Sequence, residues 1–252
     1  MRITIITVCF NSEKTIERTI QSVLAQTCQN VEYLLIDGMS TDGTLEIIQK
    51  YETAFRDKGY AYKWISEKDR GIYDAMNKGL KYAAGDFIGI LNSDDWYEEG
   101  ALESIEQAVE NSRKKGKEPA DIYMGSIRIH NGGQLIIKRG RDRKYKTTRN
   151  FNHPAMFVKR ECYKAVGGYG IHNIHDDYGW YLRAVKMDMT VEIIDKVLTN
   201  YPTGGAGSPK SIGKTIKRIG AKYRVYRENG YSRLYFLECA GQELMKYALL
   251  RR

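Results

Sequence analysis

Apolar and polar residues alternate along the first half of the chain in two patterns, one typical of buried strands and one typical of helices. Short apolar runs predict strands over residues 2–8, 31–37, 62–66 and 86–91. Between the first two runs, Ile16 and Ile20 begin an apolar set at helical spacing after Ser12, a residue suited to cap a helix. Similar patterns predict helices over residues 44–55, 72–83 and 97–115. Strands that alternate with helices indicate parallel βαβ units, so the sequence predicts an α/β fold.

The second half is less regular and ends in a helical tail. Apolar runs predict strands over residues 121–127, 134–138, 155–158 and 190–194, and a helix over residues 178–187. A Gly-rich stretch at residues 201–208 precedes two predicted tail helices, over residues 208–229 and 232–250. Ser208 and Pro209 suit the cap and first position of the first tail helix. Its apolar stripe consists of Ile212, Ile216, Ile219, Tyr223 and Tyr226.

Length and cysteine content narrow the class of protein. A chain of 252 residues can bury a sizeable core, and no apolar run approaches the roughly 20 residues of a membrane-spanning helix. The apolar start of the chain lacks a small-residue cleavage site, so we expect a protein that is not secreted. Its four cysteines, Cys9, Cys28, Cys162 and Cys239, are widely scattered. This spacing argues against a disulfide framework and against a zinc site, and it suits a reducing compartment.

The net charge of +9 is concentrated in the tail. Residues 203–252 carry eleven Lys and Arg against three Glu, so the preceding residues are nearly neutral. A nucleic-acid-binding module would carry its basic residues on the core, and acidic strand ends would repel a phosphate backbone. We therefore expect no nucleic-acid partner.

Acidic or polar residues follow three of the predicted strands. Asp37 ends the second strand, Glu67 and Asp69 follow the third, and residues 92–95 (Asn-Ser-Asp-Asp) follow the fourth. Ligands of open parallel sheets bind at the carboxyl ends of the strands. One such Asp would suit a turn, but several carboxylates at one edge repel one another unless a cation lies among them. Mg²⁺ or Mn²⁺ held by one or two carboxylates, phosphate oxygens and water is the expected arrangement.

Four stretches resemble, in order, the motifs of the family-two glycosyltransferases: residues 6–16, 37–44, 66–79 and 92–95. The resemblance covers residues 3–208. It implies the GT-A fold, a Rossmann-like α/β architecture with a mostly parallel central sheet flanked by helices, here with a C-terminal helical extension. We accordingly expect a catalytic domain over residues 1–202, divided into a nucleotide-binding half (1–95) and an acceptor-side half (96–202). Residues 203–252 form the Gly-rich loop and basic helical tail.

The resemblance also implies which residues bind donor and metal. The family's Asp-x-Asp motif falls on residues 92–95, which implies Asp94 as the ligand of Mn²⁺ or Mg²⁺. Asn92 replaces the first Asp of that motif. The nucleotide-sugar site implied by the family comprises Thr7, Val8, Asn11, Asp37, Glu67, Asp69, Asn92, Asp95 and His153. For His153, the alternative is a buried histidine in a turn. For residues 201–208, a lid and a plain linker both remain open.

Residues 175–183 (His-Asp-Asp-Tyr-Gly-Trp-Tyr-Leu-Arg) resemble the helix that carries the family's general base. The register with Arg183 favours Asp177 as the base and leaves Asp176 as the alternative. Such a group is needed because the acceptor hydroxyl must lose its proton as it attacks the anomeric carbon. One displacement, without a covalent nucleophile, inverts that carbon. We therefore expect a metal-dependent inverting glycosyltransferase that uses a UDP-sugar.

Neither membrane helices nor the Gln-x-x-Arg-Trp motif of the processive members occurs here. This absence favours the addition of one or a few sugars to a glycan or lipid-linked acceptor in bacterial surface polysaccharide assembly. Two rival classes are a nucleotidyltransferase and an inactive scaffold. The first would carry a Gly-rich loop with Arg and Lys after the first strand, where residues 9–12 are Cys-Phe-Asn-Ser. The second is suggested by Asn92 and opposed by Asp94, Asp95 and Asp177.

The first tail helix combines its apolar stripe with five cations: Lys214, Lys217, Arg218, Lys222 and Arg224. A helix of this kind can lie on an anionic membrane surface. Its stripe can also dock on the catalytic core. Both interpretations stay open, and the expected location is the cytoplasm, with contact to the inner face of the cell membrane. The sequence makes no prediction of the oligomeric state.

Overall fold

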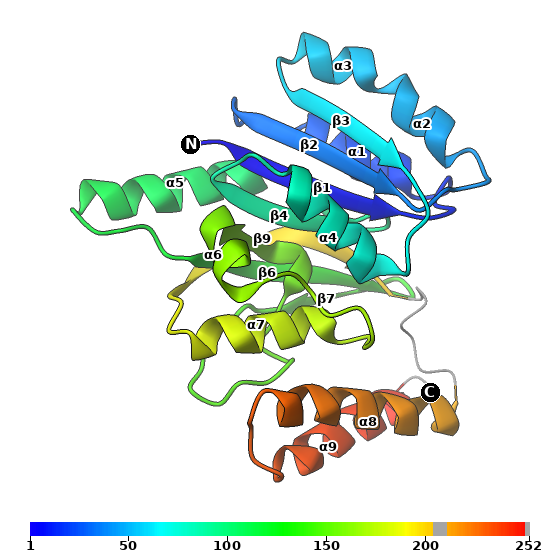
Figure 1. Ribbon diagram of the computed structural model, residues 1–252, viewed down its shortest axis with the longest axis vertical. Helices are drawn as coiled ribbons and strands as arrows, with labels where there is room; N and C mark the ends of the chain where they lie inside the picture. Colours follow the sequence, from blue (N-terminus) through cyan, green and yellow to red (C-terminus); the bar gives the residue numbers. More distant parts are fainter. Residues whose placement is uncertain (204–210, 250–252) are drawn as a thin grey trace.

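The computed structural model describes residues 1–203 and 211–249 (Figure 1). The nine strands of the described residues form one sheet in the order β3-β2-β1-β4-β8-β6-β9-β5, and β7 pairs with β6 beyond the stretch of β6 that pairs with β8. The strands are β1 (Ile3–Cys9), β2 (Val31–Asp37), β3 (Ala61–Ser66), β4 (Phe87–Asn92), β5 (Trp96–Tyr97), β6 (Ile122–Asn131), β7 (Gln134–Lys138), β8 (Met156–Lys159) and β9 (Val191–Pro202). β3, β2, β1 and β4 are parallel, whereas the remainder of the sheet is mixed.

Helices cover both faces of the sheet (Figure 1). One face is covered by α1 (Ile16–Leu24), α2 (Thr44–Lys50), α3 (Glu52–Asp57) and α5 (Ala101–Lys114). The other face is covered by α4 (Ile72–Tyr82), α6 (Arg160–Val166) and α7 (Asp176–Lys186), and a short 3₁₀ helix, η1 (His153–Ala155), precedes β8. Along β1, Ile3 and Ile5 join the first core, whereas Ile6 and Val8 join the second. This two-residue alternation explains why the central strands read as continuous apolar runs.

The carboxyl ends of the parallel strands meet at one edge of the sheet. Cys9 of β1 lies beside Asp37 of β2, and Asp37 lies beside Ser66 of β3. On the other side of β1, Val8 lies beside Asn92 of β4. The polar residues that follow these strands are therefore brought together, as the sequence predicts. The predicted division of the catalytic domain at residue 95 stays a prediction.

Several predicted element boundaries are wrong. The helix predicted over residues 44–55 is interrupted at Tyr51, whose N–H bonds to the carbonyl of Ile48 three residues back, at 3.2 Å. The helix predicted from residue 97 begins at Ala101, because Gly100 has a left-handed φ of 70° and Trp96–Tyr97 forms β5. Helix α6 was not predicted.

The last strand of the sheet is much longer than predicted. β9 continues from Val191 to Pro202, whereas the apolar pattern predicts an end at residue 194. Asp195 and Lys196 interrupt the apolar pattern, and the pairing of β9 with β6 is irregular around them. Tyr201 and Pro202 therefore belong to the sheet and not to the predicted Gly-rich loop. Residues 204–208 of that loop lie outside the described part of the chain.

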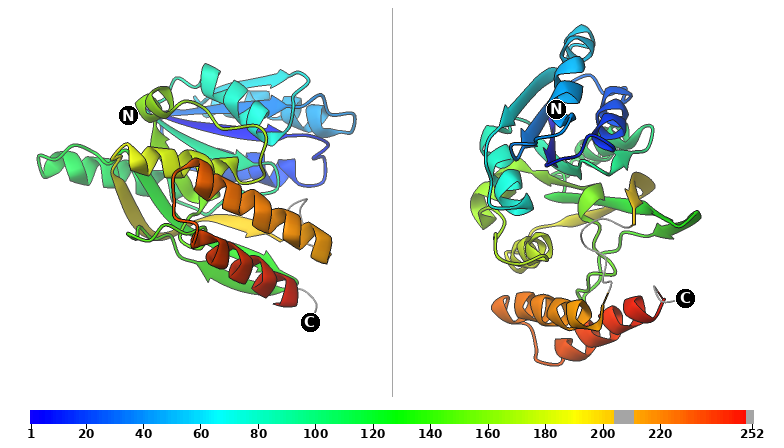
Figure 2. Two further views of the ribbon diagram at one scale, coloured as in Figure 1. Left: turned by 60° about the horizontal axis from the view of Figure 1, so that its bottom comes forward. Right: turned by 90° about the vertical axis from the view of Figure 1, so that its right-hand side faces the viewer.

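The tail forms a helical hairpin that packs beneath α7, away from the parallel strands (Figures 1 and 2). It consists of α8 (Ile212–Glu228) and α9 (Tyr235–Leu249). Tyr226 of α8 donates a hydrogen bond to the hydroxyl of Tyr178 on α7, at 3.2 Å. Ser211 caps α8 by accepting a hydrogen bond from the N–H of Lys214; the predicted cap, Ser208 with Pro209, lies outside the described residues. Within residues 1–203 and 211–249, no helix is long and apolar enough to cross a bilayer.

The prediction that Lys222 belongs to an exposed cationic flank of the first tail helix is wrong. This side chain is 1% exposed and forms an ion pair of 2.6 Å with buried Glu243 of α9. Arg218 also contacts Glu243, at 2.9 Å. The apolar stripe is divided as well: Ile219 and Tyr226 are buried, whereas Ile216 is exposed. The pattern of α8 alone could not reveal a counter-charge supplied by α9.

Candidate active site

The loops after β1 and β2 are joined by hydrogen bonds at the carboxyl edge of the sheet. Asn11 has a left-handed φ of 48°, a conformation that Asn tolerates better than most residues. Its side-chain oxygen accepts a hydrogen bond from the N–H of Thr41 at 2.9 Å, and its own N–H donates to Ser40 at 2.8 Å. The N–H of Ser12 donates to Thr44 at 2.8 Å. These hydrogen bonds join the predicted donor-binding loop to the turn after β2 and to the start of α2.

Asp37 lies at the centre of this network and is fully buried. Its carboxylate accepts hydrogen bonds from the hydroxyls of Ser40 and Ser66, and from the N–H of Ser40 at 3.0 Å. Burial, followed by the negative charge of Asp37, raises the pKa of the neighbouring Cys9 thiol, which therefore stays protonated. Asp37 orders the turn after β2, and its contact with a nucleotide stays a prediction.

Thr7 and Val8 are predicted donor-site residues inside β1. Both are buried, and the hydroxyl of Tyr33 donates a hydrogen bond to Thr7 at 3.0 Å. Thr7 faces the core that contains α1 and α5, and Val8 faces the opposite core. These side chains shape the strand, and their contact with a donor stays a prediction.

Glu67 and Asp69 follow β3 at the outer part of the same edge. Glu67 is exposed and pairs with Lys78 of α4 at 3.0 Å. Asp69 accepts a hydrogen bond from the N–H of Gly71 at 2.8 Å. A Cβ atom at Gly38 would lie 2.5 Å from Oδ2 of Asp69, so the turn after β2 and the loop after β3 touch at a glycine. This close approach places Asp69 beside the Asp37 turn.

The turn at residues 92–95 supplies the candidate metal ligands. Asp95 is fully buried, and its Oδ2 accepts a hydrogen bond from Asn92 at 3.2 Å. The Oδ1 atoms of Asn92 and Asp95 are buried and accept no hydrogen bond from any residue that the structure describes. Ser93 is 2.8 Å from Ser12, which links this turn to the loop after β1. Two unpartnered oxygens beside Asp94 are unusual, because buried polar atoms are normally satisfied.

The electrostatics of this turn suit a cation. Burial raises the pKa of Asp94, and burial followed by the charge of Asp94 raises the pKa of Asp95 well above its ordinary value. Within the described ranges, no group of three or more His, Cys, Asp or Glu could by itself hold a metal ion. A carboxylate and amide oxygens nevertheless fit Mg²⁺ or Mn²⁺, since such ions take the remaining ligands from substrate phosphate and water.

Asp176 and Asp177 begin α7 but make different contacts. Asp176 Oδ2 accepts hydrogen bonds from the N–H groups of His172 and Asn173, at 2.9 and 2.8 Å. Asp177 instead accepts a hydrogen bond of 3.1 Å from the hydroxyl of Tyr73, which reaches across from α4. Asp176 thus holds the loop before α7. Asp177 contacts Tyr73 of the block of residues 66–79 that follows β3, and its role as the base stays a prediction.

Tyr201 lies near the end of β9, and the sequence did not identify it. Its side chain is 38% exposed. Burial of the remainder, followed by the negative charges of Asp95, Asp94 and Asp177, raises the pKa of Tyr201 to about 12. The apolar residues Val197 and Leu198 before it could have indicated that the strand continues to this position.

His153 and Lys138 lie near the same carboxylate, Asp177. His153 is buried in η1, and its Nε2 is 3.2 Å from the hydroxyl of Tyr169. Burial lowers the pKa of His153, so its ring is neutral at pH 7. Burial, followed by repulsion from Lys246, lowers the pKa of Lys138 to about 7, and Asp177 acts in the opposite direction. The structure fits a buried turn histidine, and contact between His153 and a donor stays a prediction.

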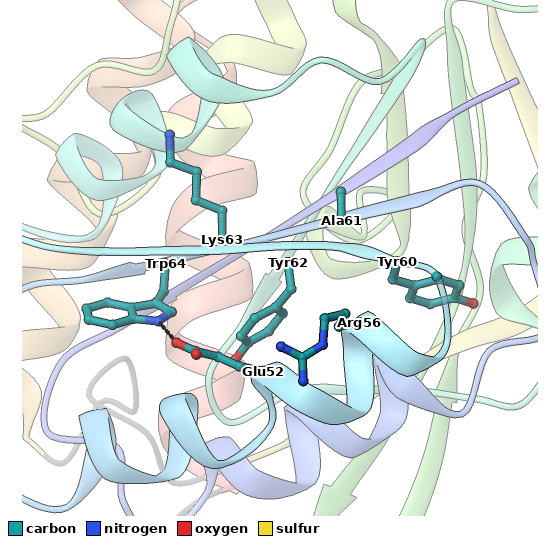
Figure 3. A pocket seen from close by; sticks show the side chains of 8 residues that line it. Glu52, Arg56, Tyr60, Ala61, Tyr62, Lys63 and Trp64 are labelled. Atoms are coloured by element: carbon teal, nitrogen blue, oxygen red, sulfur yellow. Dashed lines mark hydrogen bonds between the residues drawn. The ribbon is translucent and has the colours of Figure 1, made fainter.

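A separate hollow of about 730 Å³ lies at the outer edge of β3 (Figure 3). It is lined by Glu52 and Arg56 of α3 and by residues 59–64, and Trp64 donates a hydrogen bond of 2.7 Å to Glu52 (Figure 3). None of the predicted site residues lines this hollow. The carboxyl edge of the sheet therefore remains the candidate active site.

The fold and the carboxyl-edge site define a glycosyltransferase of the GT-A class. The chain matches the family model described as Glycosyl transferase family 2 over residues 4–185, and it belongs to that family. An uncharacterized glycosyltransferase of Mycobacterium tuberculosis (strain H37Rv) is 30% identical, with 97% of this chain and 92% of the relative covered. A PGL/p-HBAD biosynthesis glycosyltransferase of Mycobacterium bovis is 27% identical over 82% of this chain and 79% of the relative.

Solved structures show the same fold at low sequence identity. Staphylococcus aureus TarS 1–349 in complex with UDP-GlcNAc superposes with a TM-score of 0.67 at 19% identity, covering 98% of this chain and 72% of that chain. The mannosyltransferase PcManGT of Pyrobaculum calidifontis, in complex with GDP-Man and Mn²⁺, gives a TM-score of 0.63 at 18% identity, covering 98% and 75%. The GT-A expectation is thereby confirmed.

Proposed function

We propose that this glycosyltransferase is metal-dependent and inverting, and that it moves a sugar from a UDP-sugar to a hydroxyl of a glycan or lipid-linked acceptor in bacterial surface polysaccharide assembly. The observation that carries the proposal is the turn at residues 92–95, where the buried Oδ1 atoms of Asn92 and Asp95 accept no hydrogen bond from any residue that the structure describes. Ser93 of this turn lies 2.8 Å from Ser12, so the turn is joined to the loop after β1 at the carboxyl edge of the sheet. The nucleotide-sugar complexes of TarS and PcManGT, and the biosynthetic role named for the M. bovis relative, support this assignment.

The donor would lie over the carboxyl ends of β1, β2 and β4. The loop of Asn11 and the turn of Asp37 are already joined there, and Asp69 touches the same turn. We assign the nucleoside to this part of the edge and the diphosphate to the turn at residues 92–95. Preformed loops lower the entropic cost of binding, because little ordering remains to be done when the donor arrives.

We assign Asp94 as the principal protein ligand of Mn²⁺ or Mg²⁺. The unpartnered oxygens of Asn92 and Asp95 lie in the same turn and suit either direct contact with the ion or contact with its water ligands. The bound ion supplies stabilisation of the negative charge that grows on the departing nucleoside diphosphate. The replacement of the first Asp of the motif by Asn92 keeps an oxygen donor at that position.

Asp177 is assigned as the general base. Its carboxylate accepts a hydrogen bond from Tyr73, which fixes the orientation of one oxygen and leaves the other to receive the proton of the acceptor hydroxyl. Attack on the face opposite the leaving group inverts the anomeric carbon. A lipid-linked acceptor would place this reaction at the cytoplasmic face of the membrane.

Release of nucleoside diphosphate tests the proposal directly. The full chain is incubated with UDP-glucose, UDP-galactose, UDP-GlcNAc or GDP-mannose, each with Mn²⁺, Mg²⁺ or EDTA, and products are separated by chromatography. Hydrolysis of one donor that requires the metal and fails in Asp94→Ala is the expected result. Metal-independent hydrolysis would refute the assignment of the metal. A nucleotidyltransferase would instead release no nucleoside diphosphate and, in a parallel reaction with added pyrophosphate, would convert the nucleotide-sugar into a nucleoside triphosphate and a sugar 1-phosphate.

A further inference from the structure

The hairpin of α8 and α9 exposes an apolar surface on the side turned away from the core. On α9, Tyr235, Cys239, Gln242 and Glu243 are buried, whereas the opposite side is exposed. That exposed side carries large apolar residues at helical spacing, together with two small residues, Gly241 and Ala248. Its large members are Phe236, Leu237, Leu244 and Met245. Two of these, Leu237 and Met245, are 70% and 58% exposed.

The exposed surface extends beyond α9. Tyr223 of α8 and Phe236 of α9 contact each other at a ring-centroid distance of 5.5 Å. Ile216 lies two helical turns before Tyr223 and is 61% exposed, and Leu234 in the turn between the helices is 73% exposed. We name these residues the outer face: Ile216, Leu234, Phe236, Leu237, Leu244 and Met245. An apolar patch of this kind marks a contact site, since soluble surfaces rarely gather so many large apolar residues.

The charges around the outer face select the kind of partner. The exposed cations of residues 211–249 are Lys214, Lys217, Arg224, Arg227, Arg233 and Lys246. Glu228 is the single exposed acidic residue of the same stretch. A second copy docked through this face about a twofold axis would place like charges opposite one another. An anionic surface matches both the apolar centre and the cationic surround.

We propose that the outer face docks on an anionic lipid bilayer as an interfacial surface, with Leu237 and Met245 entering the head-group region. The inference deepens the proposed lipid-linked acceptor and rests on that part of the proposed function. It differs from the contact that the sequence predicts, because the apolar side of α9 makes the contact and Lys222 is buried away from it. The hydrogen bond between Tyr226 and Tyr178 ties the bound hairpin to α7, the helix of Asp177.

Vesicle sedimentation tests the docking surface with two matched variants. Leu237→Gln/Met245→Gln removes two side chains of the outer face, and Leu135→Gln/Ile137→Gln removes two side chains of β7 that are 63% and 53% exposed. Each protein is mixed with phosphatidylcholine vesicles, with and without phosphatidylglycerol. We expect the parent and the β7 variant to bind anionic vesicles equally, and the outer-face variant to bind at least tenfold more weakly.

A third variant, Lys217→Gln/Arg224→Gln/Arg233→Gln, separates charge from apolar contact. At low salt, we expect this variant to bind anionic vesicles more weakly than the parent does. At high salt, the two proteins should bind equally, because salt screens the attraction between the cations of the parent and the lipid. Failure of the parent to bind either vesicle, or equal binding by the outer-face variant, would overturn the inference. So would a dimer in sedimentation equilibrium that the outer-face substitutions dissociate while vesicle binding is absent.

Donor hydrolysis without vesicles separates this inference from the proposed function. The outer-face variant keeps the whole carboxyl edge, so its hydrolysis of the active donor and its thermal unfolding should match those of the parent. Unchanged hydrolysis with lost vesicle binding supports the docking surface. If no protein hydrolyses a donor, the proposed function fails, and the vesicle results still decide whether the outer face binds lipid.

Discussion

Glu243 holds the tail hairpin together, and its replacement by Gln should destabilise the protein strongly. The side chain is fully buried and receives Lys222 at 2.6 Å, Arg218 at 2.9 Å and Lys246 at 3.4 Å. Lys222 is itself 1% exposed, so Glu243→Gln leaves a buried ammonium without its counter-charge. Removal of one partner of a buried pair costs about 3–5 kcal/mol. Lys246 is half exposed, so water screens its attraction to Glu243 more than that of buried Lys222.

The pKa of Glu243 gives a second measure of the same effect. Burial alone would raise the pKa, but the charges of Lys246 and Lys222 overcome burial and lower it from 4.5 to about 2. A difference of this size corresponds to about 3 kcal/mol of stability. Because the folded pKa is the lower one, this stability is present above pH 4.5 and is lost as the pH falls towards 2.

Urea and thermal unfolding at pH 7 measure the loss. We expect Glu243→Gln to unfold roughly 6–20 °C below the parent, and to lack the part of the acid dependence between about pH 4.5 and 2 that Glu243 contributes. Lys222→Met/Glu243→Leu removes both charges and fills the same space, so it should recover most of the stability. Equal stability of the parent and Glu243→Gln, with the hairpin still docked by limited proteolysis, would refute the reasoning.

Three further predictions concern the candidate active site. Asp177→Asn should retain donor binding, measured by calorimetry, and should lose about 10²- to 10⁴-fold in transfer rate. Asp176→Asn should keep most of the transfer rate, and the reverse result would exchange the roles of the two residues. Asp94→Ala should abolish the metal-dependent part of donor affinity in the same calorimetric assay, and unchanged affinity would remove it as a ligand. Tyr201→Phe should keep the fold by circular dichroism and lower turnover, because it removes a hydroxyl that is subject to the negative charges of Asp95, Asp94 and Asp177; unchanged turnover would show that this hydroxyl takes no part in the reaction.

The parallel half of the sheet was predictable because its signals are local. The buried strand at Val31–Asp37 has the predicted bounds, because its apolar run Tyr33–Ile36 is buried on both faces and is followed by a polar turn. The meeting of the loop after β1 with the turns after β2 and β4 then follows from the parallel order of the strands. The particular hydrogen bonds at this edge, such as the one from the hydroxyl of Ser66 to Asp37, could be identified only from the register of β3 against β2.

The acceptor side was less predictable because its strands tolerate polar interruptions. Asp195 and Lys196 interrupt the apolar pattern of β9, so the pattern predicts an end at residue 194, although Val197 and Leu198 resume it before Tyr201. The choice between Asp176 and Asp177 also depends on contacts beyond the helix itself. Tyr73 comes from α4, more than 100 residues earlier, and no spacing rule connects it to α7.

The tail shows why the residue pattern of one helix does not reveal which of its side chains are exposed. The pattern of α8 predicts a single apolar stripe beside a basic flank, and either could have faced the core. In the structure Lys222 is buried in an ion pair with Glu243 of α9, whereas Ile216 of the apolar stripe is exposed. A cation is therefore buried and an apolar residue is left outside, the reverse of what burial by residue type predicts. The surface that remains for a partner is consequently set by the pairing of the two helices, and the apolar side of α9 becomes its centre.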